Sequence, residues 1–234
     1  VLVTATTTHG TNPSLFKKLP YDPVKDFEPV AGLTEGYYLL IVKKDMPVNT
    51  LAELISWLKA NPGAASYGWG ATVSQVTGAA FLSRIGATAV GVPYKSSPQA
   101  VTDLIAGQFT FMFQDILSVL AQAKAGRMKV LATTSPQRLG TLPDVPLMAE
   151  AGMPNFYAAA YTGMFAPAGT PEPIIRRLNE AIVKAQRRRD FADKLETCCA
   201  AYQLITTPAE FTEYTRKDRA LWAERIAAAG IRPE

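Results

Sequence analysis

The feature that most constrains the fold is a regular alternation of strand-like and helix-like segments between residues 50 and 132. Thr50 and Glu53 form a capping-box pattern at the start of the first helix. The pattern predicts helices over residues 51–60, 76–85, 98–106 and 116–125, and strands over residues 64–68, 89–92, 109–113 and 129–132. Such alternation predicts a parallel sheet wrapped by helices, which is an α/β fold.

The turn between the strand 64–68 and the helix 76–85 is a candidate anion site. It contains Gly68 and Gly70, which let a ligand approach the backbone, and the hydroxyls of Thr72 and Ser74. The first N–H groups of the helix lie at the positive end of its dipole. The alternative is that a hydroxyl simply caps the helix and that the glycines only relieve crowding.

Three polar segments follow predicted strands of this sheet. They are residues 68–74, residues 93–97 and the pair Gln114 and Asp115. Right-handed crossovers bring the carboxyl ends of parallel strands to one edge, so we expect these segments to converge there and to favour the anion site. Asp115 has an alternative role as the cap of the helix that begins at Ile116.

The flanking segments predict a second, discontinuous lobe. Residues 1–5 resemble a strand, residues 6–13 a polar loop that includes His9, and residues 17–27 a surface loop; within the other lobe, residues 147–151 are predicted to form a short helix. Strands are predicted over residues 27–33 and 37–42, with Gly36 between them, and over residues 160–166. One long helix is predicted from Pro171 to about Phe191, with Thr170 as its cap. A second long helix is predicted after a capping box formed by Thr207 and Glu210. We expect lobe 1 to comprise residues 1–37 and 160–234, and lobe 2 residues 38–159, with the ligand in the cleft of a hinged clamshell.

Composition argues against several functions. The 24 basic and 20 acidic residues leave a net charge of +4, and the dense basic run Arg187–Arg189 lacks the interleaved aromatic residues of a nucleic-acid surface. No apolar run approaches membrane-span length. One histidine and two adjacent cysteines, Cys198 and Cys199, give no framework for a metal, and no catalytic residue, cofactor site or nucleotide-binding motif is predicted. An enzyme using Ser74 or Asp115 is disfavoured because neither has a base partner.

Several long strings resemble the Bug/TctC family of substrate-binding proteins of tripartite tricarboxylate transporters. They are Asn12–Leu15 with Lys18–Phe27, Val92–Lys95, Leu142–Pro146 with Ala149–Gly152, and Phe165–Pro171, and in order and spacing they cover nearly the whole chain. The resemblance implies a type II periplasmic binding protein-like fold, with two α/β lobes joined by two crossing strands. It also implies a periplasmic receptor that captures a small carboxylate and presents it to membrane transporter subunits.

The chain departs from the family pattern in three places. The signal peptide, first strand, glycine-rich turn and first helix of the family have no counterpart here, so we expect the encoded site to be incomplete by itself. Trp69 replaces a small residue in a shortened turn, and Gln114 stands where the family often has Asp. These changes predict a narrower, altered pocket.

The predicted function is an extracytoplasmic solute receptor for a di- or tricarboxylate or an aromatic carboxylate. The alternative is a ligand-sensing effector module or signalling receptor for an organic acid. The predicted ligand-binding residues are Thr7, Thr8, His9, Trp69, Gly70, Ala71, Thr72, Val73, Ser74, Gln114, Asp115 and Tyr161. We expect backbone N–H groups and hydroxyls of Ala71–Ser74 to hold the carboxylate without an ion pair, because no Lys or Arg lies between Lys59 and Arg84. An alternative for His9 is a loop residue bonded to nearby backbone.

Overall fold

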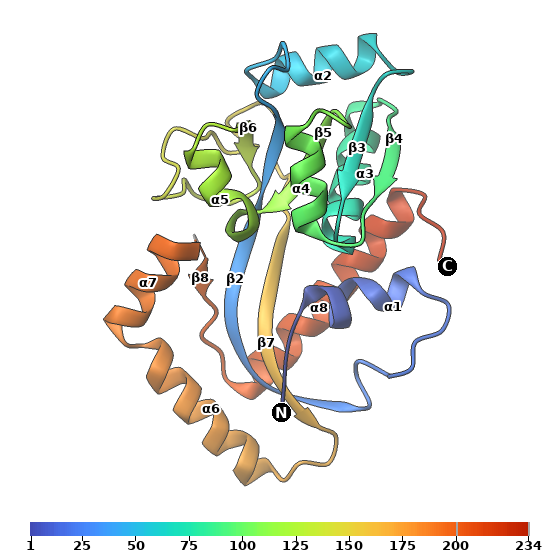
Figure 1. Ribbon diagram of the computed structural model, residues 1–234. Helices are drawn as coiled ribbons and strands as arrows, with labels where there is room; N and C mark the ends of the chain where they lie inside the picture. The colour runs from blue at the N-terminus through green and yellow to red at the C-terminus, as the bar shows by residue number, and fades with distance from the viewer. Residues whose placement is uncertain (200, 234) are drawn as a thin grey trace. The chain divides into compact units, whose positions relative to one another are not determined.

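The computed structural model describes residues 1–199 and 201–233, without the side chains of Cys198 and Cys199. The prediction that these two cysteines give no framework for a metal therefore lies outside the described residues. The chain divides into two compact units (Figure 1). Unit 1 consists of Val1–Gly36 and Ala160–Glu234, and unit 2 of Tyr37–Ala159. Two strands, β2 (Phe27–Lys43) and β7 (Ala159–Pro167), contain the points at which the chain passes between the units.

Unit 2 is built on the part of β2 from Tyr38 onward. Its remaining elements are α2 (Leu51–Ala60), β3 (Ser66–Trp69), α3 (Thr72–Ile85), β4 (Val90–Pro93), α4 (Ser97–Ile105), β5 (Phe111–Asp115), α5 (Ile116–Lys124) and β6 (Met128–Thr133). The strands β4, β3 and β5 are parallel neighbours, and β2 runs antiparallel between β5 and β6. The predicted α/β sheet is therefore confirmed, with one antiparallel strand inside it.

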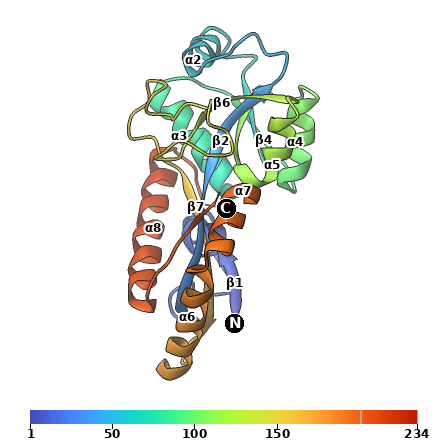
Figure 2. The same ribbon diagram turned by 90° about the vertical axis from the view of Figure 1, so that its left-hand side faces the viewer.

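Helices cover both faces of the unit 2 sheet. Figure 2 shows α3 on one side and α4 and α5 on the other. Leu39–Val42 and Phe111–Phe113 are fully buried, as their nearly continuous apolar sequences predict for strands covered on both faces. Burial of this kind, at about 25 cal/mol per Å² of apolar surface, is the main force that holds the sheet between its helices.

Unit 1 holds the first and last parts of the chain. Its elements besides the shared strands are β1 (Leu2–Ala5), η1 (Thr7–Thr11), α1 (Asn12–Leu15), α6 (Glu172–Gln186), α7 (Arg189–Cys199), β8 (Tyr202–Gln203) and α8 (Pro208–Ala228). β1 pairs antiparallel with β7, which neighbours β2, and β8 pairs with β2 at Thr34 and Glu35. α8 runs beside β2 and β7 and packs Phe211 against Tyr161 and Phe165 (Figure 2).

Two amide side chains attach α6 to the edge of β2. Asn179 donates from Nδ2 to the carbonyls of Val30 (2.9 Å) and Thr206 (2.8 Å). Gln186 donates from Nε2 to the carbonyl of Leu33 at 2.8 Å. These bonds satisfy buried backbone acceptors that an apolar helix face would leave unpaired.

Three predicted elements are wrong in unit 1. Residues 6–13 are not a loop but the π-helical turn η1 followed by α1, because the Thr11 hydroxyl donates to the Thr7 carbonyl and closes the turn. The strands predicted on either side of Gly36 are one strand of 17 residues. The helix predicted to reach Phe191 ends at Gln186; Pro171 is its N-cap residue, since the Thr170 hydroxyl donates to the Pro167 carbonyl instead of capping.

Unit 2 differs from prediction in one element, and three of its elements begin two or more residues away from the expected start. Residues 147–151 form turns and no helix, because the Glu150 carboxylate accepts from the Leu147 N–H and pairs with Arg138. β3 and β5 each begin two residues later than expected, and α3 begins four residues earlier, at Thr72. The earlier start places Thr72, Val73 and Ser74 inside the first turn of α3.

Candidate functional site

Glycine is required in the turn after β3 because protein atoms crowd it. A Cβ atom at Gly70 would lie 2.2 Å from the Ser97 backbone nitrogen and 2.3 Å from the Ser96 carbonyl carbon. A Cβ atom at Gly68 would lie 2.4 Å from the Phe109 ring. Relief of crowding therefore accounts for both glycines, and it fixes the turn directly against the start of α4.

The N-cap residue of α3 is Ala71, which makes no side-chain capping bond. The Ser74 hydroxyl bonds to none of the described residues, so the capping alternative is wrong for Ser74. Ser74 is 1% exposed, and its Oγ has no hydrogen-bond partner. Thr77, one turn further on, instead donates its hydroxyl to the Val73 carbonyl at 2.7 Å. The first turn of α3 therefore presents a buried hydroxyl with no bond inside the protein.

Trp69 packs inside unit 2. Its ring lies 5.0 Å from that of Tyr67, centroid to centroid, and a Cβ atom at Gly91 of β4 would come within 2.7 Å of it. The indole therefore covers β4 where a glycine leaves room.

Gln114 and Asp115 end β5. Asp115 caps α5: its Oδ1 accepts from the Ser118 N–H at 2.9 Å and its Oδ2 from the Ser118 hydroxyl at 2.8 Å. The amide nitrogen of Gln114 also donates to Oδ2 of Asp115. Gln114 is fully buried, and its Oε1 has no partner. The capping role considered for Asp115 is therefore confirmed, while Gln114 keeps an unused acceptor.

In unit 1, the predicted residues Thr7, Thr8 and His9 lie in η1. The Thr8 hydroxyl is bonded to the Ala5 carbonyl and to Nδ1 of His9, both at 3.0 Å. The Thr7 carbonyl accepts from Thr11. These polar groups are therefore engaged in stabilising the turn itself.

His9 is buried, not exposed in a loop. Its ring stacks on Phe165 with centroids 4.1 Å apart and contacts the Phe27 ring edge-on at 4.9 Å. Burial, and secondarily the positive charge of Arg219, lower its pKa to about 4, so the ring is neutral near pH 7. Its Nε2 has no hydrogen-bond partner.

Tyr161 lies on β7, where its N–H donates to the Thr6 hydroxyl at 2.9 Å. Its ring packs edge-on against Phe211 and Tyr214. The phenol oxygen is buried without a partner, and burial raises the pKa of Tyr161 well above its usual value. Tyr161 is thus a neutral hydroxyl among aromatic rings.

Asp218 is a partly buried ionisable residue that sequence reasoning missed. Its Oδ1 accepts from Nε1 of Trp222 at 3.0 Å, while its Oδ2 has no partner and lies where a Cβ atom of Gly10 would be 2.5 Å away. Burial raises the pKa of Asp218 to about 7. A signal was available: Phe211, Thr215, Trp222 and Ile226 form the buried face of α8, and Asp218 falls on that face at helical spacing.

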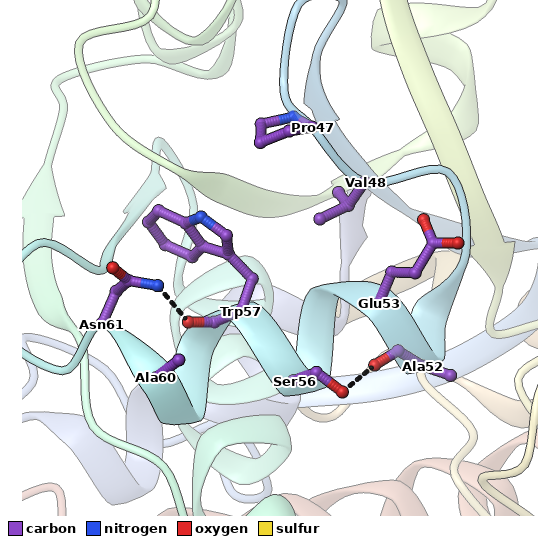
Figure 3. Close-up of a pocket in the computed structure, with 8 residues that line it drawn as sticks. All are labelled: Pro47, Val48, Ala52, Glu53, Ser56, Trp57, Ala60 and Asn61. Atoms are coloured by element: carbon purple, nitrogen blue, oxygen red, sulfur yellow. Dashed lines mark hydrogen bonds between the residues drawn. The ribbon is translucent and has the colours of Figure 1, made fainter.

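Two surface hollows do not coincide with these residues. One, of about 470 Å³, lies beside α2 (Figure 3) and is lined by Pro47, Val48, Ala52, Glu53, Ser56, Trp57, Ala60 and Asn61. Its polar side chains are engaged: Ser56 donates to Ala52, Asn61 to Trp57, and Glu53 accepts from Asn49. The other, of about 510 Å³, adjoins the start of α8, where Glu210 and Glu213 are also bonded. Neither hollow gathers unused polar groups as a ligand site does.

Within residues 1–199 and 201–233, no group of three acidic, histidine or cysteine side chains could hold a metal ion. No helix in this part of the chain is long and apolar enough to cross a membrane. In unit 2, the described residues that keep an unused polar atom among those predicted to bind the ligand are Ser74, with its hydroxyl, and Gln114, with its carbonyl.

Comparison with known proteins identifies the class. Residues 1–202 match the tripartite tricarboxylate transporter family receptor, TctC, so the chain belongs to this family. A UPF0065 protein of Agrobacterium vitis is 30% identical over 221 residues, which are 93% of this chain and 64% of that protein. BugT of Bordetella pertussis is 29% identical, over 94% of this chain and 68% of its own. The chain spans 64%, 55% and 50% of the length of the first three curated relatives.

Solved structures give the same class. A Rhodopseudomonas palustris protein solved with adipate superposes with a TM-score of 0.93 at 28% identity, covering 99% of this chain and 78% of that chain. MatC of the same organism, solved with malate, gives 0.84 at 31% identity, covering 96% and 78%. The periplasmic binding protein fold and the family resemblance are therefore confirmed, and these relatives are solute-binding receptors, not enzymes.

Proposed function

We propose that this chain is part of an extracytoplasmic receptor that binds a small organic acid and delivers it to a tripartite membrane transporter. The family and the neighbours solved with adipate and malate support a carboxylate as the ligand. The periplasm is the proposed location because the family and the related binding protein BugD are periplasmic.

The observation that carries the proposal is the first turn of α3. The turn has no side-chain cap, its Ser74 hydroxyl is buried without a partner, and helix N-terminal N–H groups favour an anion. In the proposed mode, the backbone of Ala71–Ser74 and the Ser74 hydroxyl hold one carboxylate group. Gly70 keeps this turn in place against α4.

The remaining predicted ligand residues have weaker support. Thr7, Thr8 and His9 are bonded within η1, and Trp69 packs against Tyr67 and Gly91. His9 and Tyr161 each keep one unused polar atom. We propose these five residues only as additional ligand contacts. The carboxylate itself is proposed to bind in unit 2.

The test is a thermal-shift screen against aliphatic and aromatic carboxylates, followed by calorimetric titration of Ser74→Ala. A ligand at a hundredfold excess over Kd stabilises the folded protein by about 2.7 kcal/mol. Loss of one hydrogen bond to a carboxylate weakens binding by about 1.5–3 kcal/mol, roughly tenfold to more than a hundredfold. Thr77→Val is the matched control, because this neighbouring hydroxyl is already bonded to Val73.

Two results would count against the proposal. One is the absence of any stabilisation across the panel with a folded protein. The other is an equal loss of affinity in Ser74→Ala and Thr77→Val, since that would reflect general damage to α3 rather than a lost ligand contact.

A further inference from the structure

The amide of Gln114 has a fixed orientation. Its nitrogen donates to Oδ2 of Asp115, whose carboxylate is itself held by the backbone N–H and the hydroxyl of Ser118. An ionised carboxylate offers only acceptors, so only the nitrogen end of the amide can face it. The carbonyl oxygen of Gln114 must therefore point away from Asp115.

That oxygen is buried and unused. Gln114 is fully buried, and Oε1 makes no hydrogen bond with any described residue. Buried polar atoms without partners are uncommon in folded proteins and call for a specific explanation. Since Oε1 is an acceptor, the group that satisfies it has to bring a hydrogen.

Oε1 belongs to the same part of unit 2 as the Ser74 hydroxyl. β3 and β5 are parallel neighbours, α3 packs against β5, and both unused atoms follow the carboxyl ends of these strands. A hydroxyl can donate or accept, whereas the carbonyl of Gln114 can only accept. The two atoms are therefore suited to different groups of one ligand.

Resting on the proposed function, we infer that the acid recognised by this chain carries a hydrogen-bond donor that Oε1 of Gln114 accepts. The donor is a hydroxyl or an ammonium group on the carbon skeleton, so the substrate class is hydroxy or amino acids. A ligand carboxylate does not fit at Oε1, because two acceptors would face each other. An unsubstituted diacid leaves Oε1 unsatisfied, and that difference sets specificity.

The experiment is calorimetric titration with acids matched in length that differ only at one carbon. Succinate, malate and aspartate form one series, and glutarate, 2-hydroxyglutarate and glutamate form a second. We expect the best substituted acid to bind at least about tenfold more tightly than its unsubstituted parent, as for a hydrogen bond whose loss leaves a buried group unpaired. Comparison of the affinities for the hydroxy acid and the amino acid in each series shows whether the donor is a hydroxyl or an ammonium group.

Two variants assign the effect to Gln114. Gln114→Met keeps the length of the side chain but removes the acceptor, so the preference for the substituted acid falls to within about twofold. Gln114→Leu also lacks the acceptor and should lower the preference in the same way. Thr77→Val is the control and keeps the wild-type preference. Thermal unfolding establishes that each variant is folded.

The outcomes separate this inference from the function beneath it. Binding of acids by the wild-type protein without discrimination, or a preference that survives in folded Gln114→Met, overturns the role of Gln114 and leaves the receptor function intact. If Gln114→Met does not fold, Gln114→Leu takes its place, and a preference that survives in folded Gln114→Leu overturns the inference. Failure of the folded wild-type protein to bind any acid overturns both.

Discussion

The buried polar groups of the two units differ in kind. In unit 1 three of them are ionisable, namely His9, Tyr161 and Asp218, and burial shifts the pKa of each toward its neutral form, while Asn12 and Gln186 each keep an unused amide oxygen. Among the described residues of unit 2 the unused groups are the hydroxyls of Ser74 and Thr141 and the Gln114 carbonyl, which have no charge to lose. The comparison teaches that pH should act on the stability of unit 1 and leave the proposed carboxylate turn of unit 2 unaffected.

The largest expected effect is on Asp218. Its folded-state pKa of about 7 lies above the model-compound value of 3.8, so its contribution to stability is complete below about pH 4 and is lost as pH rises through 7. Burial is the largest cause and Glu35 adds to it, and together they outweigh the Trp222 hydrogen bond and the charges of Arg225 and Arg219, which lower the pKa. Asp218→Asn retains an acceptor for Trp222 and should be more stable than wild type at pH 8 by up to about 4 kcal/mol. Urea unfolding at pH 5 and pH 8 measures the difference; a gain that does not grow with pH would contradict it.

His9 should act in the opposite direction. Its folded-state pKa of about 4 lies below the model value of 6.5, so its contribution is present above pH 6.5 and is lost as pH falls through 4. His9→Gln, which cannot be protonated, should reduce the loss of stability between pH 7 and pH 4 by up to about 3 kcal/mol. Acid titration followed by tryptophan fluorescence, with Asp218→Asn as the background, isolates this effect. An equal loss of stability between pH 7 and pH 4 with and without the His9→Gln substitution would contradict this role of His9.

In unit 2, the corresponding sensitive position is Gly70. A methyl group there meets the Ser96–Ser97 backbone, so Gly70→Ala should lower stability by about 1–3 kcal/mol and displace the turn. Gly63→Ala is the matched control, because nothing lies within 4 Å of a Cβ atom at that position. Thermal unfolding and carboxylate titration of both variants, at pH 6 and pH 8, should give losses that do not depend on pH. Equal stability of the two variants would remove the steric argument.

The smallest expected effect compares the starts of two helices. Thr207 caps α8 by accepting from the Glu210 N–H at 3.2 Å, and Glu210 accepts in return from the Thr207 N–H at 2.8 Å. Thr207→Ala should therefore cost about 1 kcal/mol. Ser74→Ala, which removes no bond within the protein, should change stability of the ligand-free form by less than about 0.5 kcal/mol. Chemical unfolding measures both changes in the free energy of unfolding. A larger loss for Ser74→Ala would contradict the prediction, because it would mean that the Ser74 hydroxyl makes a stabilising bond within the protein.

Local sequence patterns predicted the regular part of the fold. Periodicity and the Thr50–Glu53 and Thr207–Glu210 pairs located α2 and α8, because capping bonds form between residues three apart in sequence. The same approach failed at η1, where hydroxyls close a π-helical turn, and at residues 147–151, where Glu150 is held by distant Arg138. Both errors come from side-chain bonds that override local propensity.

The sequence predicted where the residues of the candidate site lie, but not which of their polar groups already have hydrogen-bond partners. Sequence order placed Ser74 and Gln114 after neighbouring parallel strands; Ser74 does follow β3, while Gln114 is the next-to-last residue of β5 itself. It could not indicate that Thr8 is already bonded to His9, or that Asp115 is occupied by Ser118 and Gln114. Whether a polar group is free depends on tertiary partners, which a single sequence does not specify.

The pairing of β1 with β7 imposes an order on folding during synthesis. In the sheet, Leu2–Ala5 pair with residues 162–165, and all of unit 2, Tyr37–Ala159, lies between them in the chain. At roughly 5–20 residues per second, the ribosome needs on the order of ten seconds to pass from β1 to β7. Unit 2 therefore can fold while the edge of β1, with Val1 and Val3 more than half exposed even in the finished protein, still lacks its partner. A strand edge of this kind can pair with other strands, so folding of unit 1 should depend on keeping β1 from associating before β7 has been made.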